Sequence, residues 1–246
     1  HWLTENEALK NFITPEIYLA TRERFTNHKA GDLNRILTNT AASQPYCFNL
    51  IVYLQQHIKL ADQLFSSLLN KNVNVQHLEP EFTPNQCDSI NGFMRHGDES
   101  IGDQNGKQGT DADIAVFYNY DSDKKGLLLI EFKFIEAEFS ICSSFRAKKE
   151  LKSLCNGNQY YSELIENQKR DSTKKFLCGY NKFYNWTLTR NSKVINNEKV
   201  KSLSNCPFKF GLNQLWRNML LAEQVSSSRK CDEFNFWVFS PKANDE

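Results

Sequence analysis

The sequence predicts an α/β fold whose elements run in the order helix, strand, strand, strand, helix, strand. Two observations carry this prediction. Two short apolar runs flank the polar, turn-forming insert 119–126, as expected of a β-hairpin. A strand-like segment precedes this hairpin, and an amphipathic helical pattern followed by a further strand-like segment comes after it.

The region before the hairpin is predicted to be largely helical. Residues 1–42 read as a polar helical extension, in which Pro15 favours the first turn of a helix. Residues 43–69 form a stronger helical block, because their apolar side chains recur near helical spacing. The segment 73–82 alternates enough for a strand, and Pro80 within it indicates an edge strand or a bulge.

The region after the hairpin mixes helical and irregular patterns. Residues 147–154 and 159–168 have helical patterns, whereas the polar segment 191–205 predicts a loop. Residues 210–225 form an amphipathic pattern typical of a helix. The last predicted element is a strand over 233–239, which reads EFNFWVF.

Size, composition and cysteine usage are those of a soluble globular protein. The 246 residues are enough for one sizeable domain, and no apolar run approaches the roughly 20 residues that span a bilayer. The first residues lack the pattern of a secretion signal. Seven scattered cysteines without a Cys-x-x-Cys motif argue against a disulfide framework or a zinc knuckle. We therefore expect a reducing compartment and a cytoplasmic protein.

The net charge of +1 conceals a strong asymmetry. Residues 1–141 carry 12 Lys and Arg against 19 Asp and Glu, whereas residues 142–231 carry 17 against 6. A basic segment suits the phosphate backbone of a nucleic acid, and an acidic one suits a metal ion. A solvated surface without a ligand is the alternative. The candidate phosphate contacts in the basic segment are Lys148, Lys149, Lys174 and Lys175.

The hairpin carries charged residues at one end of an otherwise apolar structure. Glu131 and Lys133 interrupt the hydrophobic run 127–134 and share one face, because side chains alternate along a strand. If paired residue numbers sum to about 245, Asp113 lies opposite these two residues and Asp111 one pair further along. An unpaired buried charge costs several kcal/mol. A metal ion held by carboxylates is the simplest compensation.

Two acids and a lysine form a site with a definite chemistry. Such a site binds a hard divalent cation through oxygens and holds an ammonium beside a phosphate or an attacking water. The alternative is a surface pair of Glu131 and Lys133 on an edge strand, with the aspartates capping a turn. Against it, Leu127 and Leu129 share the face of the pair, and the opposite face is wholly apolar.

The pattern Asp-x(17)-Glu-x-Lys, written as GTDAD…LLIEFK, resembles the motif of the PD-(D/E)XK nuclease superfamily. The resemblance implies a restriction-endonuclease-like fold, with an αβββαβ core and a mixed sheet flanked by helices. The core would cover 43–136 and 209–240 of a single domain, 1–246. Residues 137–208 would then be a basic insertion. No proline precedes the acid here, although the family name contains one; many members lack it.

Site roles follow from the resemblance residue by residue. Asp113 and Glu131 would bind Mg²⁺ or Mn²⁺, and the catalytic Lys133 would position or activate water. Phe132 would lend its backbone carbonyl to the metal, and Glu81 would add a further acid, with an exposed strand position as its alternative. Further contacts with the site or with nucleic acid are expected from Asp111, Glu136, Gln214 and Arg217. An ordinary solvated position is the alternative for these residues.

The expected function is therefore that of a magnesium-dependent deoxyribonuclease that hydrolyses phosphodiester bonds. A homodimer is compatible with this expectation. One alternative is a non-catalytic nucleic-acid-binding module of the same fold, although the intact set of Asp, Glu and Lys argues against decay of the site. Another is a carboxylate-pair hydrolase acting on sugars, which the neighbouring lysine and the basic segment do not suit. The sequence leaves open DNA or RNA, duplex or single strand, and sequence specificity.

Overall fold

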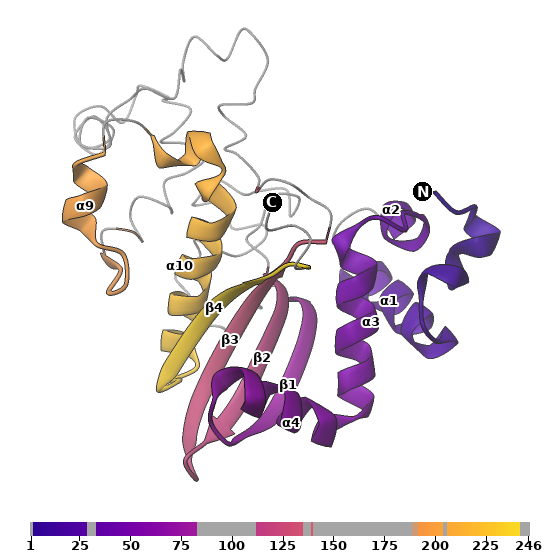
Figure 1. The fold of residues 1–246 in the computed structure, drawn as a ribbon, viewed down its shortest axis with the longest axis horizontal. Helices are drawn as coiled ribbons and strands as arrows, with labels where there is room; N and C mark the ends of the chain where they lie inside the picture. Colours follow the sequence, from indigo (N-terminus) through magenta and orange to yellow (C-terminus); the bar gives the residue numbers. More distant parts are fainter. Residues whose placement is uncertain are drawn as a thin grey trace, which may run out of the picture. The chain divides into compact units, whose positions relative to one another are not determined.

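The computed structural model describes residues 2–28, 33–82, 112–134, 139, 189, 191–203 and 206–241. Contacts within the chain divide it into two compact units. The first comprises 1–88, 111–137 and 225–246, and the second comprises 89–110 and 138–224. All strands shown in Figure 1 belong to the first unit.

A four-stranded mixed sheet forms the centre of the first unit. Its strands lie in the order β1-β2-β3-β4 (Figure 1). β2 is antiparallel to both β1 and β3, and β4 is parallel to β3. The strands are β1 (Val73–Phe82), β2 (Ala112–Tyr120), β3 (Lys124–Phe132) and β4 (Glu233–Phe239). The predicted mixed α/β architecture is confirmed, since helices precede β1 and a helix lies between β3 and β4 in the chain.

β2 and β3 form the predicted hairpin. Ile114 pairs with Ile130 and Tyr118 with Gly126, a register one residue away from the predicted one. The turn contains Asp121 and Ser122, whose φ angles of 45° and 73° lie in the left-handed region. Such angles are usual in tight hairpin turns, because they match the twist of the flanking strands.

Helices α3 (Ser43–Gln56) and α4 (Ile58–Leu69) pack on one face of the sheet. The sequence predicts a single helical block over 43–69, but His57, with φ −127° and ψ 58°, interrupts the helix. The buried side chains of this layer include Cys47, Ile51, Leu54, Ala61 and Phe65 from the helices, and Ile114, Val116, Leu128 and Ile130 from the strands. This apolar layer holds the hairpin against the helices.

The N-terminal helices pack around α3. They are η1 (Glu5–Asn11), α1 (Pro15–His28) and α2 (Leu33–Thr38). As predicted, α1 begins at Pro15. Ile17 and Phe25 of α1 share a buried cluster with Ile36 of α2 and Phe48 of α3. The polar extension predicted over 1–42 is thus anchored to the core by its apolar side chains.

β1 is an edge strand, as Pro80 predicted, and its register shifts between Val75 and His77. Helix side chains hydrogen-bond the backbone groups on its outer edge. Ser66 Oγ accepts from the Val73 N–H (3.0 Å), Asp62 Oδ1 accepts from the Val75 N–H (2.6 Å), Gln55 Nε2 donates to the Leu78 carbonyl (2.7 Å), and Arg24 Nη2 donates to the Glu81 carbonyl (2.8 Å). These bonds attach α1, α3 and α4 to the strand as well as to the face of the sheet.

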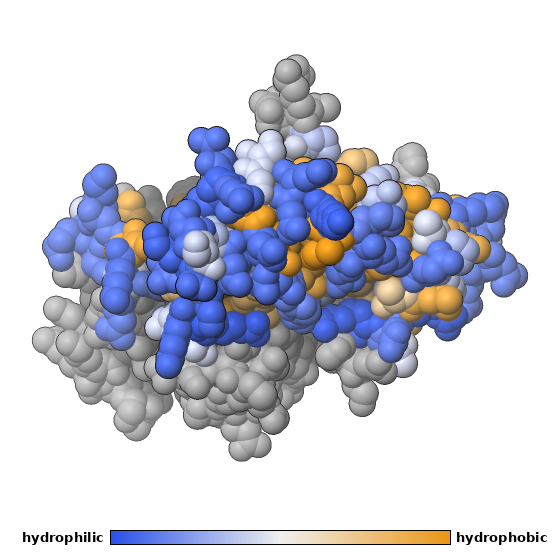
Figure 2. All heavy atoms as spheres, turned by 90° about the horizontal axis from the view of Figure 1, so that it is seen from below, coloured by the Kyte–Doolittle hydropathy of each residue, from blue (hydrophilic) through white to orange (hydrophobic). Residues whose placement is uncertain are grey.

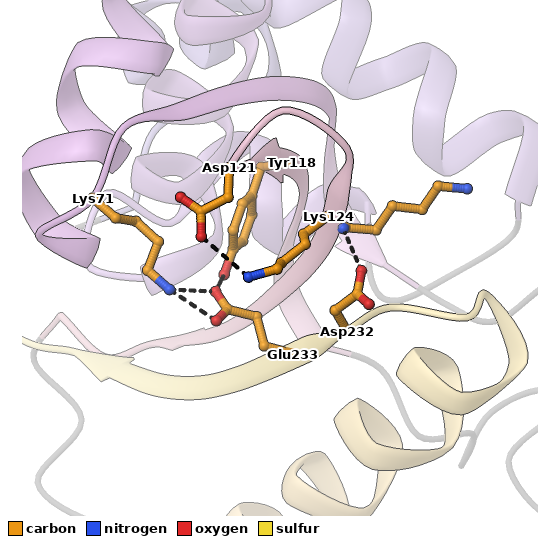
Figure 3. Close-up of polar contacts among 7 residues, drawn as sticks. Lys71, Tyr118, Asp121, Lys124, Asp232 and Glu233 are labelled. Atoms are coloured by element: carbon orange, nitrogen blue, oxygen red, sulfur yellow. Dashed lines mark hydrogen bonds and ion pairs between the residues drawn. The ribbon is translucent and has the colours of Figure 1, made fainter.

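A polar cluster joins the turn end of the hairpin to β4 (Figure 3). Glu233 accepts hydrogen bonds from Lys71 Nζ (2.7 and 2.8 Å) and from the Tyr118 hydroxyl (2.6 Å). The Tyr118 ring lies over its cross-strand partner Gly126, where a Cβ atom would be 2.2 Å from the ring. A glycine is therefore required at this position if Tyr118 is to reach β4.

The second unit contains α9 (Asn197–Lys201), η3 (Pro207–Phe210) and most of α10 (Leu212–Ser228). The loop predicted over 191–205 is wrong in part, because the Asn196 side chain caps α9 by accepting from the Lys199 N–H (3.0 Å). The helix predicted over 210–225 is confirmed with shifted bounds. Trp216 Nε1 donates to Thr189 Oγ1 at 2.7 Å.

None of the helices in the part of the chain that the structure describes is long and apolar enough to cross a membrane. Figure 2 shows hydrophilic residues over most of one face, with apolar residues between them. The helices predicted over 147–154 and 159–168 lie outside the residues that the structure describes.

Candidate active site

Three acidic residues lie at the same level on three neighbouring strands. Asp113 of β2 stands opposite Glu131 of β3 when the hairpin register is continued by one residue. Glu81 of β1 stands opposite Asp113, between the paired positions Pro80 and Phe82. Glu81 and Glu131 are 6% and 2% exposed, so both glutamates are largely withdrawn from water, whereas Asp113 is half-buried.

Two acids of the row, Asp113 and Glu131, are expected on the same sheet face as the lysine of the motif. Ile114 and Ile130 point into the apolar layer beneath α3 and α4. Since side chains alternate along a strand, Asp113, Glu131 and Lys133 point to the other face. The ion pair between Lys133 and Glu131 is compatible with the predicted sharing of one strand face by these two residues.

Hydrogen bonds and an ion pair fix these side chains. Asp113 Oδ2 accepts from the Phe132 N–H at 2.6 Å, and Lys133 Nζ lies 2.8 Å from Glu131 Oε1. The Lys133 N–H donates to the Phe239 carbonyl at 2.7 Å, which extends the β3–β4 pairing beyond Phe132. The side chain of Lys133 is 13% exposed, so its ammonium is held near the acids in a place that water reaches poorly.

The acids oppose one another's ionisation. Burial raises the pKa of Asp113 well above its usual range, and the nearby Glu131 and Glu81 raise it further. The Phe132 N–H and the Lys133 ammonium act in the opposite direction but do not outweigh them. A cation bound beside Asp113 would favour its ionised form and so oppose the effect of the two glutamates.

A family model described as PD-(D/E)XK nuclease superfamily matches residues 2–246. The chain belongs to the PD-(D/E)XK nuclease superfamily. The match extends over nearly the whole chain, far beyond the hairpin that carries the motif. No curated protein and no solved structure is similar enough to the chain to be matched. Membership accords with the mixed sheet and indicates nuclease-type activity on nucleic acid.

The donor set of this superfamily member suits a hard divalent cation. Mg²⁺ prefers oxygen ligands and is usually held by one or two carboxylates together with waters and substrate phosphates. Within the described ranges, no three acidic, His or Cys side chains converge as ligands of one ion. Two of the acids in the row are sufficient for Mg²⁺ of this kind, so the residues present fit the metal that PD-(D/E)XK nucleases typically use.

Glu81 has an unusual backbone conformation. Its φ angle of 49° lies in the left-handed region, which is uncommon for residues other than Gly, Asn and Asp. Arg24 Nη2 donates to the Glu81 carbonyl (2.8 Å) and lies 2.6 Å from Glu79 Oε1. Burial raises the pKa of Glu79, but His77 and Arg24 outweigh it, and the net pKa is lowered. Glu79 is therefore a partner of Arg24.

Two residues of this region were missed from the sequence. The Cys47 thiol donates to the Asp113 carbonyl (3.1 Å), and burial together with Asp113, Glu81 and Glu131 raises its pKa. Arg24 reaches Glu81 across 57 positions of sequence. No spacing or motif in the sequence pairs Cys47 of α3 with β2 or Arg24 of α1 with β1, so neither contact could be predicted.

The other predicted site residues are not tested by the structure. Gln214 and Arg217 are half-buried on α10 in the second unit, and their roles at the site stay predictions. The remaining ones lie outside the described residues: Asp111, Glu136, Lys148, Lys149, Lys174 and Lys175.

Proposed function

We propose that this superfamily member is a Mg²⁺- or Mn²⁺-dependent deoxyribonuclease that hydrolyses phosphodiester bonds. One observation carries the proposal: the buried Glu81 and Glu131 and the half-buried Asp113 form a row on three strands, and the Lys133 ammonium is bound to Glu131. A non-catalytic module would have no need of so costly a cluster.

Each residue of the row has a role that follows from its contacts. Asp113 and Glu131 would hold the metal, with the Phe132 carbonyl as a further oxygen ligand. Glu81 lies near Asp113 but does not converge with the other two acids on one point, so its carboxylate would join them when the metal binds. When bound, the metal supplies a Lewis acid for the phosphate and lowers the pKa of a coordinated water. The Phe132 N–H keeps the Asp113 carboxylate in one orientation, which reduces the reorganisation needed for binding.

Lys133 acts on the attacking water and on the phosphate. An ammonium has three N–H groups, so the bond to Glu131 is compatible with a second bond to the water or to a phosphate oxygen. The ammonium orients that water for attack on phosphorus and stabilises the charge that develops in the transition state. Because the side chain is mostly withdrawn from water, this interaction is stronger than it would be on the surface.

The substrate class follows from charge. Residues 142–231 carry 17 Lys and Arg against 6 Asp and Glu, which suits the backbone of a nucleic acid. DNA is the substrate that the family resemblance favours.

Cleavage assays test the proposal. Plasmid DNA and labelled DNA and RNA oligonucleotides are incubated with Mg²⁺, with Mn²⁺ and with EDTA. We expect cleavage of DNA with metal only, and its loss in Glu131→Gln and Lys133→Ala. The matched controls are Glu23→Gln and Lys59→Ala, both at exposed helix positions, which keep wild-type cleavage. A folded Glu131→Gln variant that cuts at the wild-type rate would overturn the proposal, and cleavage of RNA alone would overturn the choice of DNA.

A further inference from the structure

Arg24 of α1 binds the edge strand next to the row of acids. Its Nη2 lies 2.6 Å from Glu79 Oε1 and 2.8 Å from the Glu81 carbonyl oxygen. Both side chains of the ion pair are about one-fifth exposed, at 20% and 21%. His77 Nε2 lies 3.4 Å from the other oxygen of Glu79. Glu79 therefore fixes the guanidinium in the place from which it reaches the backbone of Glu81.

The residue that receives this bond is the one with the unusual backbone. A regular antiparallel strand has φ near −140°, whereas Glu81 has φ 49°. Such a conformation persists only where the surroundings over-determine it. The carbonyl of Glu81 is bound by Arg24, and its side chain is buried at 6% exposure beside Asp113. A change in this backbone would move the carboxylate.

We infer that Arg24 is a positioning residue for the metal-binding acids, because it holds Glu81 in the left-handed conformation that keeps its carboxylate in the row. This inference rests on the proposed function, in which Glu81 is a metal ligand. Arg24 acts through Glu81 and Glu79, and its planar guanidinium suits two acceptors at once.

A cavity of about 320 Å³ lies beside the ion pair. Apolar side chains such as Phe48 and Val52 line it together with Arg24, Gln55 and Glu79. Removal of the Arg24 side chain would enlarge this space next to the Glu79 carboxylate. A small guanidinium compound could then occupy the place of the lost group.

Metal affinity measured without substrate tests the inference. Mn²⁺ is titrated calorimetrically into the wild type, Arg24→Ala, Arg24→Lys and the control Arg22→Ala. Arg22 lies on the same helix, is exposed and contacts the Tyr18 ring, so its removal matches the lost charge. Mutation of a residue that hydrogen-bonds a metal ligand commonly lowers metal affinity by about 10- to 100-fold. We therefore expect Arg24→Ala to weaken Mn²⁺ binding by about 10-fold or more. Arg24→Lys is weakened less, and Arg22→Ala is unchanged.

Chemical rescue separates positioning from a general loss of structure. Methylguanidinium at a non-denaturing concentration should strengthen Mn²⁺ binding by Arg24→Ala, because it can bind Glu79 and the Glu81 carbonyl in the enlarged cavity. The same compound should leave Glu81→Gln unchanged, since that variant lacks the carboxylate itself. A merely structural role for Arg24 would give no rescue.

The failures of the inference and of the proposed function are distinguishable. Wild-type Mn²⁺ binding that is unaffected by Glu131→Gln would overturn the proposed function. Loss of binding in Glu131→Gln, together with wild-type affinity in a folded Arg24→Ala, would overturn the inference alone. If circular dichroism shows that Arg24→Ala does not fold, Arg24→Lys carries the test, and wild-type affinity in that variant overturns the inference.

Discussion

At the residue scale, Asp113 is held where its own charge is unfavourable. Burial and two neighbouring glutamates raise its pKa, while a single N–H and an ammonium oppose them. An acid whose pKa is higher in the folded than in the unfolded state destabilises the folded state once it ionises. The unfolding free energy therefore falls as the pH rises through the interval between the two pKa values. In the proposed function, a bound metal ion would offset this cost.

Asp113→Asn should separate stability from activity. In EDTA at pH 8 we expect this variant to be more stable than the wild type, because the amide replaces a carboxyl group whose ionised form is disfavoured by burial and by the two neighbouring glutamates. Its oxygen can still accept from the Phe132 N–H. Added Mg²⁺ should stabilise the wild type only, and only the wild type should cleave DNA.

Urea unfolding with EDTA and with Mg²⁺, together with plasmid cleavage, measures these effects. At pH 3, below the usual range of the Asp pKa, the advantage of the variant in EDTA should be gone. An Asp113→Asn protein that is less stable than the wild type at pH 8 in EDTA would contradict this account of the row.

Asp111 and Asp113 should differ in their effects. The observed register places Asp113 opposite Glu131, and Asp111 precedes the first residue of β2. Asp111→Asn should therefore keep Mn²⁺ binding close to that of the wild type, whereas Asp113→Asn loses it. Calorimetric titration of both variants in parallel measures the difference. The reverse result would show that the metal is held two residues away from the expected position.

At the element scale, a polar cluster holds β4 against the hairpin. Glu233 binds Lys71 and Tyr118, and these contacts join three segments far apart in the sequence (Figure 3). Burial raises the pKa of Glu233, but the bonds from Lys71 and Tyr118 outweigh it, so the net pKa is lowered. An acid with a lowered pKa stabilises the fold above its unfolded pKa and loses this effect as the pH falls through the folded pKa.

Glu233→Gln should therefore destabilise the protein in a pH-dependent way. At pH 7 we expect a loss of about 1 kcal/mol in unfolding free energy, because a charged hydrogen bond is weakened in a partly exposed place. The difference from the wild type should shrink as the pH falls from about 5 to below the folded pKa. Urea unfolding between pH 3 and pH 7 measures it.

The matched control for this prediction is Asp121→Asn. The Asp121–Lys124 pair is 3.3 Å long with side chains 66% and 55% exposed, so its removal should have little effect at any pH. A Glu233→Gln effect of the same size at pH 3 and pH 7 would mean that packing, not charge, fixes β4.

The elements differ in how far they could be predicted. The hairpin, β4 and the start of α1 were predictable, because each depends on patterns within a few residues: apolar alternation, turn residues and a proline. The break at His57 and the helix α9 were not, since each depends on a cap or on tertiary packing. The acids on β2 and β3 could be paired from the hairpin register, but the contacts of Arg24 and Cys47 depend on packing between distant segments.

At the scale of the whole molecule, acids and bases are divided along the chain. The strands that carry the acids lie in the first compact unit, whereas most of the basic segment 142–231 belongs to the second. The chain has two compact units, and a single domain over 1–246 stays a prediction. Separation of this kind suits a protein that holds a polyanion with one part of its chain and a metal with another.

Neutralising Lys148, Lys149, Lys174 and Lys175 together tests this division. On a Glu131→Gln background, which removes cleavage, we expect weaker binding to all DNA sequences alike. The plot of log affinity against log salt should also flatten, since each lost phosphate contact removes roughly 0.9 from its slope for duplex DNA. Filter binding or fluorescence anisotropy at several salt concentrations measures both. Unchanged affinity and slope would mean that these lysines are only solvated.

The side chains along the outer edge of β1 have a consequence for association. An open edge strand offers unpaired N–H and C=O groups as a template for a strand of another molecule. Here Ser66, Asp62, Gln55 and Arg24 already occupy such groups. Strand addition at this edge would require their displacement, which protects the sheet against aggregation from that side. A homodimer that forms by strand addition would therefore need a different sheet edge.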